Sequence, residues 1–188
     1  MLFIQHELQR AAQNLIADNI KAGEHVLIVS SSDQSRELID AIISAASSSL
    51  AETVSAIIIA APLSLKDYAH PPAVIAAVES ADLTIVATTL RFPRAYDDLS
   101  QALFRAGKRQ VLINNAPLED FSRGASLAVP KELRRRTSKL ATNISNSNSV
   151  RVTSTSGTNL KVSVCRPCIA LTGTCLLYTS PSPRDVEE

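Results

Sequence analysis

The sequence predicts a mixed α/β fold in which a parallel sheet is flanked by helices and is followed by a β-hairpin. The apolar run at residues 26–29 is continuous rather than alternating, which is typical of a strand that helices cover on both faces. Strand-then-helix units follow one another along the chain, and this order favours parallel strands with right-handed crossovers. From Val150 onward, apolar and polar residues alternate, as in a hairpin with one face in water.

The chain opens with a predicted packing helix over residues 2–20. Its apolar residues recur at the spacing of one helical face, and a cation and a glycine, Lys21 and Gly23, mark its end. The first strand follows at residues 26–29 and stops at a small polar turn, where Ser32 or Asp33 is suited to cap the next helix. That helix is predicted to run to residue 46.

Three further runs complete the predicted sheet. Residues 57–59 are all isoleucine, without polar alternation, so they are expected to be buried like residues 26–29. Pro71 and Pro72 open a helix, because proline is tolerated in a first helical turn. The predicted strands are 53–60, 83–87 and 110–113; the predicted helices are 71–78, 94–105, 118–123 and 130–143; residues 62–68 are predicted to be loop.

A polar, turn-rich stretch at residues 143–149 predicts a domain boundary. We expect an α/β amino-terminal domain at residues 1–148, with a Rossmann-like sheet, and the first β-hairpin of a second domain at residues 149–174. The hairpin is predicted to turn around Gly157. Because an isolated two-stranded hairpin is marginal in water, this one is expected to pack poorly.

Charge and composition exclude several classes of protein. Nineteen Lys and Arg residues balance 18 Asp and Glu residues, so no overall field favours nucleic acid or an anionic membrane. Neither a bilayer-spanning run nor a secretion signal is recognisable, and a cytoplasmic protein is expected. All three cysteines lie beyond residue 164, which argues against a disulfide framework in the main domain. A homodimer is left open.

Cysteine and histidine spacing gives no convincing site. Cys165 and Cys168 have the spacing of a zinc half-site or a thioredoxin-like motif, but no second pair follows them. The three histidines are far apart in sequence and form no ligand pair at helical spacing, so they are expected to be surface or packing residues. They are His6, His25 and His70.

Polar and charged clusters are each explained most simply by local structure. The turn at Ser30, Ser31, Ser32 and Asp33 lacks the glycines of a phosphate loop, so helix capping is favoured over phosphate binding. The basic run at residues 134–136 is expected to be a solvated helix face, with a phosphate or subunit contact as the alternative. After Tyr96, the carboxylates of Asp97 and Asp98 are expected to point in different directions on a helix. The residues therefore predict no catalytic, cofactor-binding or metal site.

Three segments, residues 21–29, 80–86 and 151–160, carry a family resemblance. Together they resemble the amino-terminal half of the aminopeptidase T-like metallo-aminopeptidases and of the related 2,5-dihydroxypyridine dioxygenases. The resemblance implies a divalent metal held by Glu, His and Asp residues of a carboxy-terminal domain, none of which maps onto this chain. It also implies that the chain is a non-catalytic fragment of an aminopeptidase-like enzyme acting on peptides or small molecules. The alternatives are a fragment of an iron-dependent ring-opening dioxygenase and a stand-alone α/β ligand-binding module.

Residues 175–185 resemble the translation of a transposase-type sequencing adapter. This resemblance implies that the native sequence continues differently beyond about Thr174, and that residues 175–188 are an artefactual tail. Deleting the tail is expected to leave thermal stability nearly unchanged, because it buries little apolar area. The chain as written is expected to have neither peptidase nor ring-opening activity.

Overall fold

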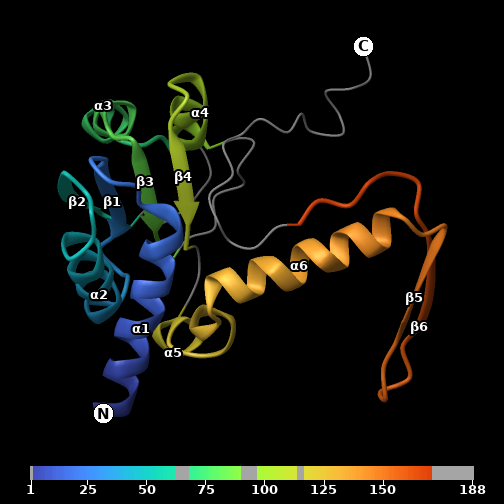
Figure 1. Ribbon diagram of the computed structural model, residues 1–188. Coiled ribbons are helices and arrows are strands. Elements are labelled where there is room, and N and C mark those ends of the chain that lie inside the picture. The colour runs from blue at the N-terminus through green and yellow to red at the C-terminus, as the bar shows by residue number, and fades with distance from the viewer. Residues whose placement is uncertain (1, 62–67, 90–96, 114–116, 171–188) are drawn as a thin grey trace. The chain divides into compact units, whose positions relative to one another are not determined.

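The computed structural model describes residues 2–61, 68–89, 97–113 and 117–170 (Figure 1). Contacts divide the chain into two compact units, one ending at Leu127 and the next covering Ala128–Gly173. The predicted boundary at residue 148 rests on composition and stays a prediction. Within the described ranges, no helix is long and apolar enough to cross a membrane.

The first unit is built on a four-stranded parallel sheet, which confirms the predicted fold class. The strand order is β2-β1-β3-β4, and each neighbouring pair is parallel. Figure 1 shows the strands side by side with helices packed around them. The strands are β1 (His25–Ser31), β2 (Thr53–Ile59), β3 (Leu83–Ala87) and β4 (Arg109–Leu112).

Helices cover both faces of this sheet. On one face, α1 and α2 pack against Ile28 and Ile85 of the central strands; on the other, α3 and α4 pack against Val29 and Val86. Gly107, which follows α4, has a φ of 66°, a conformation that glycine adopts readily at a helix end. The helices of this unit are α1 (Leu2–Asn19), α2 (Arg36–Ser47), α3 (Pro72–Ser80), α4 (Asp98–Arg105) and α5 (Leu118–Phe121), followed by the 3₁₀ helix η1 (Gly124–Leu127).

The predicted burial of residues 57–59 is wrong for one of them. Ile59 is buried and Ile57 half-buried, but Ile58 is 47% exposed. The cause is the strand order: among the described strands, β2 lies at the edge of the sheet and pairs with β1. It contributes only the half-buried Val54 to the core beneath α1 and α2. The continuous apolar run therefore predicted a strand correctly, but it did not show that this strand lies at the edge of the sheet.

The cap of α2 also differs from the prediction. Ser35 is the N-cap, and its hydroxyl accepts a hydrogen bond from the Leu38 N–H group at 3.4 Å. Ser30 and Ser31 instead continue β1, so the polar residues of this turn end the strand and leave capping to Ser35. The predicted start of a helix at residue 94, and most of the predicted loop at 62–68, lie outside the described residues.

The second unit consists of α6 (Pro130–Ser145) and a hairpin of β5 (Ser149–Thr153) and β6 (Asn159–Ser163). The antiparallel pairing confirms the predicted hairpin, with Val150 opposite Val162 and Val152 opposite Leu160. Every residue of β6 is exposed, and α6 has no buried residue. The apolar face of the hairpin thus remains largely uncovered within this unit, as expected for an isolated hairpin.

Candidate functional site

The strand order gives the first candidate site. The chain passes from β1 to β2 on one side and places β3 on the other, so a topological switch point lies between β1 and β3. In open parallel sheets, ligands bind beyond the carboxyl ends of the strands at such a point. Here Ser30 and Ser31 are the last residues of β1, Asp33 follows that strand, and Thr89 follows β3; we call these four residues the strand-end cluster.

Hydrogen bonds hold the strand-end cluster together. The Thr89 hydroxyl donates to the Asp33 carboxylate at 2.6 Å, and the Thr89 N–H group donates to the Ser31 hydroxyl at 3.4 Å. The buried Ser30 hydroxyl donates to the Ala87 carbonyl at 2.6 Å. Hydrogen bonds from Ser31 and Thr89 lower the pKa of Asp33, so this exposed carboxylate is ionised at neutral pH. Because the carboxylate is negatively charged, such a site favours a ligand with hydroxyl or N–H donors and disfavours a phosphate.

A second cluster joins the segment before α3 to the start of α4. His70 Nδ1 lies 2.5 Å from Asp98 Oδ1 and 3.5 Å from Asp97 Oδ1, and the His70 N–H group donates to Asp98 Oδ2 at 2.8 Å. The exposed fractions of the three side chains are 2% for His70, 6% for Asp97 and 39% for Asp98. The Tyr68 ring meets the imidazole edge-on, with 5.1 Å between centroids. We call His70, Asp97 and Asp98 the His70 cluster.

Polar contacts extend the His70 cluster to the sheet. Asp97 is the N-cap of α4 and accepts hydrogen bonds from the Leu99 and Ser100 N–H groups. The Ser100 hydroxyl donates to Asp97 Oδ2 at 2.8 Å and lies 3.1 Å from the Gln110 side-chain amide on β4. This network places the His70 cluster beside β4, on the face of the sheet that α3 and α4 cover.

The His70 cluster shifts the acidity of its members and of Tyr68. Desolvation tends to raise the pKa of Asp98, but hydrogen bonds from the His70 imidazole and backbone, together with the histidine's charge, outweigh it and lower that pKa. The pKa of Tyr68 is raised, first by desolvation and then by the nearby charges of Asp98 and Asp97. The phenol therefore stays protonated at neutral pH.

The structure brings together residues that the sequence interpretation kept apart. His70 was expected to be an isolated surface or packing residue, and it is buried against two carboxylates. Asp97 and Asp98 were expected to diverge as helical neighbours. Asp97 is not helical, however: with φ −84° and ψ 119° it has extended backbone, so both side chains reach one imidazole. No sequence spacing signals the contact between His70 and Asp98, which are 28 residues apart in the chain.

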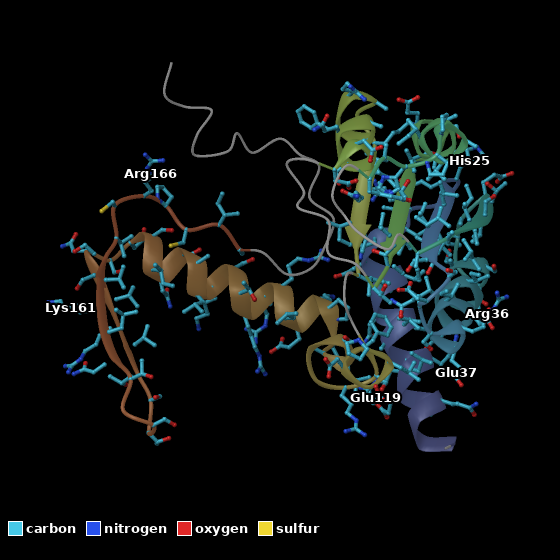
Figure 2. The ribbon with its side chains drawn as sticks, turned by 180° about the vertical axis from the view of Figure 1, so that it is seen from behind. His25, Arg36, Glu37, Glu119, Lys161 and Arg166 are labelled. Carbon is cyan, nitrogen blue, oxygen red and sulfur yellow. The ribbon has the colours of Figure 1, made fainter. Side chains whose placement is uncertain are left out.

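The other candidate residues stay separate from both clusters. His6 and His25 lie at exposed positions, and His25 Nδ1 is 2.8 Å from the Thr53 hydroxyl. Cys165 and Cys168 are exposed free cysteines. On α6, Arg135 and Arg136 pair with Glu132, and their hydrogen bonds lower the pKa of Glu132 to about 2. Figure 2 labels Lys161 on β6 and Arg166 in the segment after it.

The fold and the strand-end cluster define the class of protein: an open parallel α/β module with polar groups at its switch point, followed by a helix and a hairpin. Residues 7–176 match the model of the family described as NicX: 2,5-dihydroxypyridine 5,6-dioxygenase, and the chain belongs to that family. None of the curated proteins compared with the chain matches it.

A solved structure shares the fold. It is described as the 2,5-dihydroxypyridine dioxygenase from Pseudomonas putida KT2440, with a TM-score of 0.57 and 16% sequence identity. The match covers 85% of this chain and 48% of that one, so the chain spans about half the length of the solved dioxygenase. These comparisons confirm the resemblance to the dioxygenases and give no support to the aminopeptidase interpretation.

Proposed function

We propose that this protein takes part in oxidative ring opening of a hydroxylated pyridine, with the α/β unit forming one wall of the substrate site. The family match over residues 7–176 is the observation that carries the proposal. Within the chain, the strand-end cluster is the part suited to this task. It lies at the switch point where parallel sheets bind ligands, and it offers an ionised carboxylate to the hydroxyl and N–H donors of such a ring.

The family implies a catalytic iron, and the residues described here do not fit one. Among the described residues, the one group of three potential ligands is the His70 cluster. His70 and Asp97 are too deeply buried, at 2% and 6% side-chain exposure, to leave a face where an organic ring and oxygen could reach a shared metal. We therefore assign the α/β unit a role in binding and orienting the substrate, and no step of oxygen chemistry.

The role of Asp33 follows from its contacts. Thr89 and Ser31 hold the carboxylate in place from two strands, so it need not reorganise when a ligand arrives. A hydroxyl group of the ring that donates to Asp33 forms a charge-assisted hydrogen bond, which is stronger than a neutral one. The carboxylate also favours ring orientations that place a donor, rather than an oxyanion, next to β1.

The test measures binding and turnover separately. Binding of 2,5-dihydroxypyridine to the 188-residue chain is followed by NMR, with the amide signals of Ser31 and Thr89 as reporters. Asp33→Asn should weaken binding about tenfold, in line with the loss of one charge-assisted hydrogen bond. Asp40→Asn, which removes a surface carboxylate paired with Arg36, is the matched control and should leave binding unchanged.

Turnover is measured on the product of the native gene supplied with ferrous iron. We expect oxygen-dependent loss of the dihydroxypyridine and a product that contains both atoms of O₂. Release of an amino-terminal residue from a peptide, without pyridine oxidation, would instead support the aminopeptidase reading. Absence of any ring binding at Ser31 and Thr89 would refute the role assigned to the strand-end cluster.

A further inference from the structure

The His70 cluster holds more negative than positive charge. Two carboxylates, Asp97 and Asp98, face a single imidazole, and His70 is the one basic side chain that forms an ion pair with either of them in the described part of the chain. Their remaining partners are neutral groups, the N–H groups of His70, Leu99 and Ser100 and the Ser100 hydroxyl. Buried charges in proteins are paired or coordinate metals. Among the described residues, the His70 imidazole is thus the one basic partner of the two carboxylates, and Asp97 is nearly inaccessible to water.

The orientation of the carboxylates is a second, independent observation. Asp97 Oδ2 is held by Ser100, through its N–H group at 3.2 Å and its hydroxyl at 2.8 Å. Asp98 Oδ2 is held by the His70 N–H group at 2.8 Å. These bonds turn both Oδ1 atoms toward His70 Nδ1, and one ligand atom from each residue lies within 4.8 Å of the others. Outer hydrogen bonds that fix carboxylate ligands in this way are typical of metal sites.

Lone pairs remain for a cation at both Oδ1 atoms. The Leu99 N–H group lies 3.3 Å from Asp97 Oδ1 and 2.9 Å from Asp98 Oδ1. A carboxylate oxygen has two lone-pair directions, and the second direction at Asp98 Oδ1 faces His70 Nδ1, so an ion between these two atoms would replace their direct contact. Because the Asp98 side chain is 39% exposed, a small ion can reach the cluster from solvent, whereas a ring cannot.

We propose that His70 Nδ1, Asp97 Oδ1 and Asp98 Oδ1 bind a divalent cation of the zinc type, at a site separate from any catalytic iron. One imidazole nitrogen and two carboxylate oxygens form a donor set suited to Zn²⁺ and to Co²⁺ as its spectroscopic substitute. The cation joins the segment before α3 to the first turn of α4. Its role is to stabilise the α3/α4 face of the sheet, and it does not depend on the proposed dioxygenase function.

Binding requires a small rearrangement of the ligands. His70 Nδ1 and Asp98 Oδ1 lie 2.5 Å apart, and two ligand atoms placed about 2.0–2.2 Å from a zinc ion stand farther apart than that. Nδ1 must therefore move slightly away from Asp98 when the ion enters.

The experiment is a Co²⁺ titration of the purified 188-residue chain with Cys165 and Cys168 replaced by serine. Removing these thiols prevents their exposed pair from contributing to the signal. We expect one saturable site, with visible d–d absorption, and an increase in the thermal unfolding midpoint. Asp98→Asn should weaken binding at least tenfold, and Asp40→Asn should leave it unchanged.

Ser100→Ala provides a second variant that retains all three ligands. It removes the hydroxyl that orients Asp97, so binding should weaken less than in Asp98→Asn but measurably. This variant keeps the test decisive if Asp98→Asn folds poorly. Absence of saturable Co²⁺ binding to the folded chain, or equal binding by the chain before and after Asp98→Asn, would overturn the proposal. Neither outcome bears on the pyridine-binding experiment, which reports on Ser31 and Thr89.

Discussion

Strand β1 and the β5–β6 hairpin use similar β-branched residues and end in opposite environments. Six of the seven residues of β1 are buried, whereas all five residues of β6 are exposed. The difference lies in the partners: β1 has a strand on each side and helices on both faces, while β5 and β6 pair with each other. The burial of a strand therefore depends on its position in the sheet, and a continuous or alternating sequence pattern reflects that position only indirectly.

The largest effect on stability should come from a charge placed in the buried strand β1. Ile28 is completely buried beneath α1 and α2, so Ile28→Asp leaves a carboxylate with no partner in the core. We expect a loss of at least about 3 kcal/mol in the free energy of unfolding, measured by urea denaturation. Ile28→Val is the control and should cost about 1 kcal/mol. Equal costs for the two variants would contradict the central position of β1.

Pattern predicted the elements better than it predicted their positions. The predicted strands at residues 26–29, 53–60, 83–87 and 110–113 coincide with the four parallel strands, and the alternation after Val150 located the hairpin, because such patterns reflect local exposure. Strand order depends on contacts between distant segments, which no local pattern contains. Ile58 is an example. Three consecutive isoleucines predict a buried, central strand, but β2 is an edge strand and Ile58 is 47% exposed.

A smaller effect on stability should come from helix capping, which differs between α4 in the first unit and α6 in the second. Asp97 caps α4 through its side chain, whereas Val129 begins α6 without a side-chain cap. Asp97→Ala should therefore cost about 1–2 kcal/mol of stability, and Val129→Ala should cost nearly nothing. Thermal unfolding of both variants against the unchanged chain measures this difference. A cost for Val129→Ala as large as that for Asp97→Ala would show that capping is not the cause.

The candidate sites were predictable to different degrees. The strand-end cluster follows from a general rule, since polar residues after parallel strands meet at one edge of the sheet, and the sequence marked the turn at residues 30–33. The His70 cluster could not be found in this way. It depends on the backbone of Asp97, which is extended rather than helical, and on a histidine far away in the chain.

The pH dependence of stability should distinguish Asp98 from its uncharged replacement. Its pKa in the folded chain is lowered, so its contribution is present above the ordinary value of 3.8 and is lost as the pH falls through the folded-state pKa. Asp98→Asn should therefore lose less stability than the unchanged chain when the pH is lowered from about 6 to about 3. Denaturant titrations across this range measure the difference. Parallel curves for both proteins would exclude a contribution from Asp98.

The smallest effect should come from the counterpart of Ile28 in the hairpin. Val162 is 46% exposed on β6, so Val162→Asp places a carboxylate in water rather than in a core. We expect a change within about 0.5 kcal/mol, the range of ordinary surface substitutions, when unfolding of the first unit is followed by urea denaturation. Val162→Thr, which keeps the β-branched shape without the charge, is the control.

Limited proteolysis provides a second measurement. Cleavage in the hairpin should leave the fragment that contains β1 intact, because the residues that bury β1 belong to the first unit. A loss after Val162→Asp as large as that after Ile28→Asp would mean that the apolar face of the hairpin is covered in solution, and the contrast between the two strands would then disappear.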